Sequence, residues 1–267
     1  MEKYRYKHKK NFKERKKKSI LKNKFLWIFV FVFLTAGVSF FGFLFSPFFH
    51  EQKIIISGTN NVRENEIKNE VIYTLPKKIG FFETKNVFLA DLGKISSEII
   101  SKFPRISKIS ISRNFRREII VAVSERKSEG ILCNSTNCFY YDNSGNIFEE
   151  AFEDFRPKIK TESPEYAIKI GGNELPEKII KAVSETQKIL SENFSVKDID
   201  FIISQDAKNL TAETSEGWKV FFESESDIES QIVNLSLLLK ETIAEKERQK
   251  LDYIDLRYGS KIFYKKK

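Results

Sequence analysis

The pattern of apolar and polar positions begins with one long stretch that carries no charge. It runs from Phe25 to Phe49, and 25 helical residues rise about 37 Å, more than the ~30 Å hydrocarbon core of a bilayer. The pattern therefore predicts a single transmembrane helix over 25–49. A cleaved signal peptide is the alternative, but its apolar region usually has about 7–15 residues. Apolar sequence here continues to Phe49, which favours an uncleaved anchor.

Shorter periodic segments occupy residues 50 to 127. Alternating apolar and polar residues predict strands, and apolar spacings of three and four predict helices. We expect strands over 53–57, 108–113 and 118–125, helices over 63–73 and 92–102, and a basic loop over 76–86. The resulting order is β-α-α-β-β, in which both helices need one face of the same sheet.

The rest of the chain, 128–267, is richer in strands. We expect a hairpin over 138–148, an extended run over 167–170, helices over 176–193 and 227–248, and strands over 200–204, 210–214, 218–223, 253–258 and 261–264. The predicted fold class is therefore α+β, with one N-terminal transmembrane helix, a β-α-α-β-β domain at 50–127 and a strand-rich mixed α/β domain at 128–267. The apolar stripes on the helices are interpreted as core.

The formal charge of +9 is concentrated in the first 24 residues. This tail holds twelve Lys and Arg against two Glu, whereas the remainder holds 34 basic and 35 acidic residues, a net charge of −1. A basic tail before a membrane helix indicates a cytoplasmic N-terminus, so we expect the bulk of the chain outside the cytoplasm. The external part has no basic excess to hold a polyphosphate, and we expect no nucleic-acid partner.

The inventory of reactive side chains argues against most enzymatic chemistry. Histidine occurs only at His8, in the tail, and at His50, beside the apolar stretch, which removes His-dependent triads, zinc sites and general bases from the external domains. Asp and Glu are plentiful, but none stands in a recognisable catalytic setting. We therefore expect a protein without catalytic, cofactor-binding or metal-binding residues.

Two cysteines, Cys133 and Cys138, flank four turn-forming residues. Such a hairpin brings its ends face to face, and an oxidising compartment supports a disulfide there. Two free thiols are the alternative at this stage. A metal site would need further ligands, and the sequence offers no second Cys pair for one.

Several short motifs, in their order and spacing, resemble one known family. They are Ile54-Ile55-Ile56-Ser57-Gly58, Phe103-Pro104-Arg105-Ile106, Arg113-Asn114-Phe115, Val121-Ala122-Val123-Ser124-Glu125-Arg126, Tyr141-Asp142-Asn143-Ser144-Gly145-Asn146-Ile147-Phe148 and Tyr253-Ile254-Asp255-Leu256-Arg257-Tyr258. Together with the basic tail and the anchor, they make nearly the whole chain similar to the bacterial cell division family FtsQ/DivIB.

The resemblance implies a POTRA domain at 50–127 and a β domain at 128–267, with no enzymatic activity. It implies a single-pass protein of the cell membrane at the division septum. Its partners would be the bitopic division proteins FtsB/DivIC and FtsL and, through them, the septal peptidoglycan synthase. In relatives the last strands of the β domain accept a partner strand.

The terminal segment carries the predicted partner-binding residues. They are Arg257, Tyr258, Lys261, Ile262, Phe263 and Tyr264. Aromatic side chains supply the anchors of such interfaces, and Arg257 and Lys261 suit acidic partner residues. Alternation requires one face of the strand to pack, so either Ile262 and Tyr264 or Phe263 complete the core.

Three charged residues of the first domain have two interpretations. Arg113, Glu125 and Arg126 form either a recruitment surface or ordinary Arg/Glu pairs between adjacent strands.

Two other functions remain as alternatives to the division scaffold. One is a POTRA-bearing transport or chaperone module, although such proteins generally carry several POTRA repeats before a membrane barrel. The other is a membrane-anchored cell-wall enzyme that works with carboxylates, which would need one carboxyl group with a perturbed pKa in a cleft.

Overall fold

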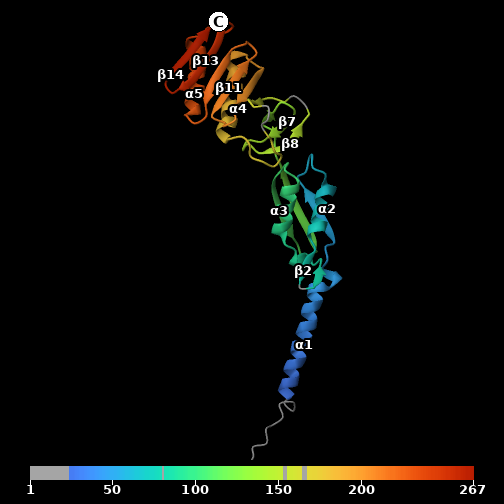
Figure 1. Cartoon of the computed structure of the whole chain (residues 1–267). Helices are drawn as coiled ribbons and strands as arrows, with labels where there is room; N and C mark the ends of the chain where they lie inside the picture. The colour runs from blue at the N-terminus through green and yellow to red at the C-terminus, as the bar shows by residue number, and fades with distance from the viewer. Residues whose placement is uncertain (1–23, 80, 153–154, 164–166) are drawn as a thin grey trace, which may run out of the picture.

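Three parts follow one another along the chain in Figure 1: a long helix, a small three-stranded sheet with two helices, and a large mixed sheet. The computed structural model describes residues 24–267 except 80, 153–154 and 164–166. Apart from Lys24, the predicted basic tail lies outside the described residues. The α+β class predicted from the sequence is confirmed.

The long helix is α1 (Lys24–Phe45), with a mean hydropathy of 2.4 in its most apolar window. By length and composition it is able to cross a membrane, as a single span or as a signal sequence. It ends four residues before the predicted boundary because Pro47 opens the short 3-10 helix η2 (Pro47–Phe49). The Ser46 hydroxyl caps η2 by accepting a hydrogen bond from the Phe48 N–H, 3.2 Å away.

The small sheet has the strand order β1-β5-β4, with β1 parallel and β4 antiparallel to β5. Its elements agree closely with the predicted β-α-α-β-β order: β1 (Lys53–Ser57), α2 (Glu64–Thr74), α3 (Leu92–Lys102), β4 (Ile106–Arg113) and β5 (Glu118–Glu125). Ile119, Val121 and Val123 alternate along β5 and are buried, as the pattern predicted. They share one core with Ile67 of α2 and Ile99 of α3.

The prediction of a loop over 76–86 was wrong. This segment forms the hairpin β2 (Lys77–Ile79) and β3 (Phe82–Thr84), followed by the 3-10 helix η3 (Val87–Leu89). Only Thr84 of the two strands is buried, so the hairpin has no alternating apolar pattern by which to recognise it.

The large sheet has nine strands in the order β14-β13-β12-β11-β10-β9-β6-β7-β8. Their bounds are β6 (Gly130–Cys133), β7 (Cys138–Tyr141), β8 (Ile147–Ala151), β9 (Lys158–Thr161), β10 (Ile199–Ile203), β11 (Asn209–Thr214), β12 (Lys219–Glu223), β13 (Leu251–Tyr258) and β14 (Lys261–Lys266). The helices α4 (Glu177–Phe194) and α5 (Ile228–Glu241) contribute to one core with the sheet, in which Trp218, Phe201 and Phe222 are fully buried.

Three predictions for this part need correction. The strand β9 was not predicted, because it has four residues, follows Pro157 and fully buries only Ile159. The run 167–170 forms no strand, although Ile168 contacts the core. The helix predicted over 227–248 is divided, since α5 ends at Glu241 and a separate turn, α6 (Glu245–Arg248), follows.

A polar joint connects the small sheet to the large one; we define it as Arg105, Arg126, Asp142 and Glu149. The Arg126 Nε donates to the carbonyl oxygen of Pro104 at 2.9 Å, and its Nη1 contacts the Asp142 carboxylate at 2.5 Å. Arg105 forms an ion pair with Glu149. The chain therefore passes from one sheet to the other through charged contacts.

Candidate partner-binding edge

The strand β14 forms one edge of the nine-stranded sheet and lies at the end of the molecule farthest from α1 (Figure 1). Among the residues that the structure describes, β14 pairs only with β13, in antiparallel register. A strand with one unpaired side presents a row of backbone N–H and C=O groups to a partner. The other edge, β8, differs because Glu149 of that strand belongs to the polar joint.

The turn before β14 fixes its direction. Gly259 adopts a φ of +63°, in the left-handed region that glycine enters without a steric penalty. The chain then reverses so that Lys261 lies opposite Tyr258 and Tyr264 opposite Ile254.

The side chains of β14 divide between two faces. Ile262 is half-buried and packs against the core of the large sheet. Of the two alternatives predicted for the core-facing side of the strand, this is the one that contains Ile262. Phe263 is 49 % exposed and forms a T-shaped contact with Tyr258, whose ring centroid lies 5.2 Å away. Tyr264 is 43 % exposed. The aromatic residues beside the edge therefore offer apolar surface next to unpaired backbone groups.

Arg257 is oriented by its own strand. Its Nε and Nη2 donate to the two carboxylate oxygens of Asp255, at 2.9 and 2.7 Å, and its guanidinium lies 5.1 Å from the ring centre of Phe221. The hydrogen bond to Asp255 raises the pKa of Arg257. Burial opposes ionisation of Asp255, but the hydrogen bonds from Arg257 lower the pKa of that carboxyl group overall. Asp255 is thus the acidic partner that this arginine already has.

Lysines hold the far end of β14 in place. The Nζ of Lys265 lies 2.9 Å from Asp252, and that of Lys266 lies 2.9 Å from Glu247. Hydrogen bonds from Lys266 and Lys250 lower the pKa of Glu247 to about 2. Lys261 is exposed and makes no ion pair with any described residue, so its charge is available near the turn.

Sequence reasoning missed the outer-face residues that support this edge. Besides Asp255 they include Phe221 and Tyr253, whose ring centroids lie 5.7 Å apart. The signal for the Asp255–Arg257 pair was present, because residues two apart on a strand share a face.

The charged residues predicted at the first domain all have intramolecular partners. Arg113 donates to two backbone carbonyls, at 2.9 and 3.1 Å, Glu125 accepts hydrogen bonds from the backbone N–H groups of 60–62, and Arg126 belongs to the polar joint. Glu125 also lies 3.4 Å from Arg105, so the contacts include one Arg/Glu pair. A recruitment surface at these positions stays a prediction.

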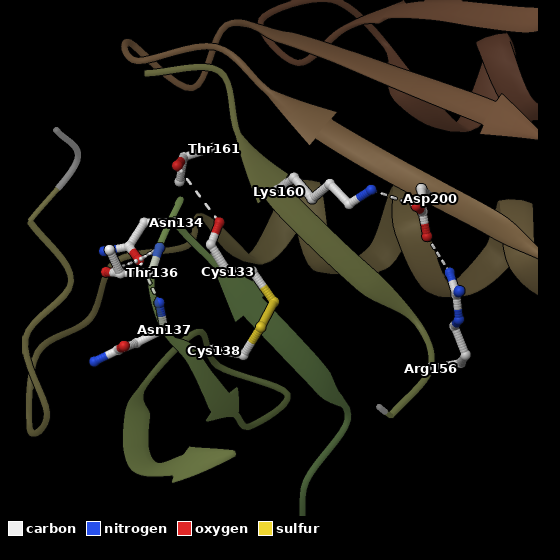
Figure 2. Close-up of a disulfide and its surroundings, with 9 residues drawn as sticks. All are labelled: Cys133, Asn134, Thr136, Asn137, Cys138, Arg156, Lys160, Thr161 and Asp200. Carbon is white, nitrogen blue, oxygen red and sulfur yellow. Dashed lines mark hydrogen bonds and ion pairs between the residues drawn. A yellow bond between two sulfur atoms is a disulfide. The ribbon is translucent and has the colours of Figure 1, made fainter. Parts of the chain in front are cut away.

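Cys133 and Cys138 form a disulfide that closes the hairpin of β6 and β7 (Figure 2). The Asn134 side chain stabilises the turn by accepting hydrogen bonds from the N–H groups of Thr136 and Asn137, at 3.0 and 2.8 Å. No cluster of three or more metal-ligating side chains occurs within the described part of the chain.

Neither the comparison with protein-family models nor that with curated proteins found a match for this chain.

Proposed function

We propose that this protein is a non-catalytic scaffold of the bacterial division machinery, of the FtsQ/DivIB kind. In this proposal α1 is retained as a single membrane span, the N-terminus is cytoplasmic, and 50–127 is a POTRA domain outside the cytoplasm at the septum. The β domain at 128–267 binds FtsB/DivIC-like and FtsL-like proteins and helps to recruit or regulate septal peptidoglycan synthesis. The observation that carries the proposal is the open edge of β14 at the far end of the large sheet.

The binding step is addition of a partner strand to β14. Main-chain hydrogen bonds supply affinity that depends little on sequence, and side-chain contacts supply specificity. Phe263 and Tyr258 provide an aromatic anchor beside the edge, where such residues contribute most to binding. Lys261 contributes a positive charge suited to an acidic residue of the partner.

The two alternative functions, a cell-wall enzyme and a transport or chaperone module, find less support in the structure. A cell-wall enzyme that uses carboxylates needs a carboxyl group whose pKa is raised toward neutrality. In the described part of the chain, every carboxyl group whose pKa departs clearly from its ordinary value has a lowered pKa. These groups are Glu125, Asp142, Asp200, Asp206, Asp227, Glu247 and Asp255. A transport or chaperone module is a third candidate, for which no specific feature of the fold argues.

The test is a binding measurement with the full chain in nanodiscs and the purified external segment of the organism's FtsB/DivIC-like protein. Wild type is compared with Phe263→Lys, which places a charge beside the edge without removing a core residue. Because anchors at such interfaces contribute about 2 kcal/mol or more, we expect an affinity loss of roughly 30-fold or more.

The control is Phe152→Lys, which alters a phenylalanine just beyond the opposite edge strand β8 that is still more exposed, 87 % against 49 % for Phe263. Its affinity should equal that of wild type. Equal losses in both variants, or tight binding by Phe263→Lys, would rule out the β14 edge. Absence of binding by folded wild type would remove the scaffold proposal itself.

A further inference from the structure

The last turn of α1 is fastened to the folded part of the chain. The final carbonyl groups of a helix lack partners within the helix. Here the Thr84 hydroxyl donates to the carbonyl oxygen of Leu44, and the Asn86 Nδ2 donates to that of Phe43, both at 2.5 Å. Thr84 and Asn86 are buried, so these contacts are shielded from water. The hairpin of β2 and β3 is therefore fixed relative to the helix.

Aromatic contacts place the same hairpin beside the last turn of α1. The ring centroid of Phe82 lies 5.5 Å from that of Phe45 and 6.3 Å from that of Phe41. Figure 1 shows β2 next to the end of α1.

The length of α1 sets the depth of this contact. Its 22 residues rise about 33 Å, slightly more than the ~30 Å hydrocarbon core. If Lys24 lies at one surface of the bilayer, Phe41 to Phe45 lie at the opposite boundary between acyl chains and headgroups. A hairpin in contact with these residues lies at the same boundary.

Several aromatic side chains at this level are largely exposed. Phe81 is fully exposed and Phe82 is more than half exposed. A second loop, between β4 and β5, presents Phe115, which is 95 % exposed. That loop lies at the same end, because the guanidinium of Arg117 stacks on the Phe48 ring at 4.5 Å. Exposed aromatic side chains gathered on one end of a protein mark an interaction site.

Basic side chains accompany these rings. Lys77, Lys78, Lys85 and Arg116 are all exposed, whereas Glu83 is the one acidic residue of the hairpin. Rings that enter the acyl boundary, flanked by lysines and arginines that remain among the headgroups, are the composition of an interfacial membrane site. We define the juxtamembrane surface as Phe81, Phe82, Phe115, Lys77, Lys78, Lys85 and Arg116.

We propose that the juxtamembrane surface binds the extracytoplasmic leaflet, with Phe81 inserted at the boundary between headgroups and acyl chains. The occupant is lipid rather than a protein because the surface continues directly from α1 at bilayer depth. This inference rests on the proposed retention of α1 as a membrane span. Its consequence is that the small sheet is held against the membrane at two points, the helix and the hairpin tip.

The test is depth-dependent fluorescence quenching with the full chain in vesicles of phosphatidylcholine and phosphatidylglycerol at 3:1. Both native cysteines are joined in a disulfide, so Phe81→Cys introduces a single free thiol for an environment-sensitive label. Phe152→Cys is the matched control, because Phe152 is also strongly exposed but lies just beyond β8 of the large sheet. Lipids that carry quenchers at shallow or deep acyl positions report depth. The lipid-dependent part of the tryptophan quenching in the same samples reports on Trp27 of α1, because Trp218 is buried in the core of the large sheet.

We expect the label at position 81 to show blue-shifted emission and stronger quenching by shallow than by deep quenchers. The label at position 152 should show neither effect. An unquenched label at position 81 together with quenched Trp27 would overturn the inference and leave the anchor intact. The same conclusion would hold if the label's emission shifted only on addition of a partner protein. Unquenched Trp27 would overturn the anchor and this inference together, independently of the strand-binding result.

Discussion

At the end of β5, a single carboxylate organises the loop that leads from β1 to α2. Glu125 accepts hydrogen bonds from the backbone N–H groups of Asn60, Asn61 and Val62, at 2.8 to 2.9 Å, and its side chain is only 5 % exposed. Burial by itself would raise the pKa of Glu125, but these donors outweigh it and lower the pKa to about 2. The charged form is therefore favoured by the fold.

We predict that Glu125→Gln destabilises the small sheet by about 2 kcal/mol at pH 7, because hydrogen bonds to a charged group are lost. Since the folded pKa is depressed from 4.5 to about 2, the wild-type contribution is full above pH 4.5 and declines as the pH falls toward 2. Urea unfolding followed by circular dichroism at pH 7 and pH 3 should show a smaller difference at pH 3.

The control for this prediction is Glu98→Gln, at an exposed position of α3. It should change the free energy of unfolding little at either pH. A Glu125→Gln effect of equal size at both pH values would contradict the assignment to the charged carboxylate.

At the scale of elements, the sequence was informative where one face of a segment is apolar. The strand β5 was predicted to the residue because Ile119, Val121 and Val123 alternate and face the core. The strand β9 was missed, since four residues with one fully buried side chain give no periodicity. The run 167–170 alternates but pairs with no strand, so alternation alone does not determine pairing.

The candidate partner-binding edge at β14 was also predictable only in part from the sequence. The aromatic terminal strand could be recognised from Ile262, Phe263 and Tyr264, and the structure places Ile262 against the core. The pairing of Arg257 with Asp255 was missed, although residues two apart on a strand share a face. The hairpin beside α1 escaped recognition since its exposed rings reflect a position next to the helix rather than a core pattern.

For the hairpin of β6 and β7 we predict a moderate effect of reduction. A disulfide that closes a loop of about six residues restricts the unfolded chain by about 2 kcal/mol. The double variant Cys133→Ser, Cys138→Ser should therefore lose about 2 kcal/mol of unfolding free energy, measured by urea titration with Trp218 fluorescence.

Reductant should lower the stability of wild type by the same amount and leave the double variant unchanged. Equal stability of oxidised and reduced wild type would show that the β6–β7 pairing and Asn134 hold the turn without the disulfide.

At the scale of the whole molecule, the ion pairs of the polar joint connect the small sheet to the large one. The Arg126 and Asp142 side chains are 19 % and 8 % exposed, so their ion pair is largely shielded from solvent. Removing one partner of such a pair leaves the other charge poorly solvated, which costs more than the loss of a surface pair.

We predict that Arg126→Gln loosens the joint while both sheets stay folded. Spin labels at exposed Lys68 and Lys240 should give a broader distance distribution in the variant than in wild type, measured by pulsed electron resonance. Lys181→Gln, which breaks an exposed ion pair between α4 and α5, is the control and should leave the distribution unchanged. An unchanged distribution in Arg126→Gln would show that other contacts fix the joint.

The order of strands in the large sheet also separates the polar joint from the β14 edge by the whole width of the sheet. Neighbouring strands are about 4.8 Å apart, so the eight intervals from β8, at the polar joint, to β14 span roughly 38 Å. An α-helix needs about 25 residues to cover that distance. In the proposed scaffold, a partner anchored in the same bilayer would therefore need a segment of comparable length between its own span and the strand that meets β14.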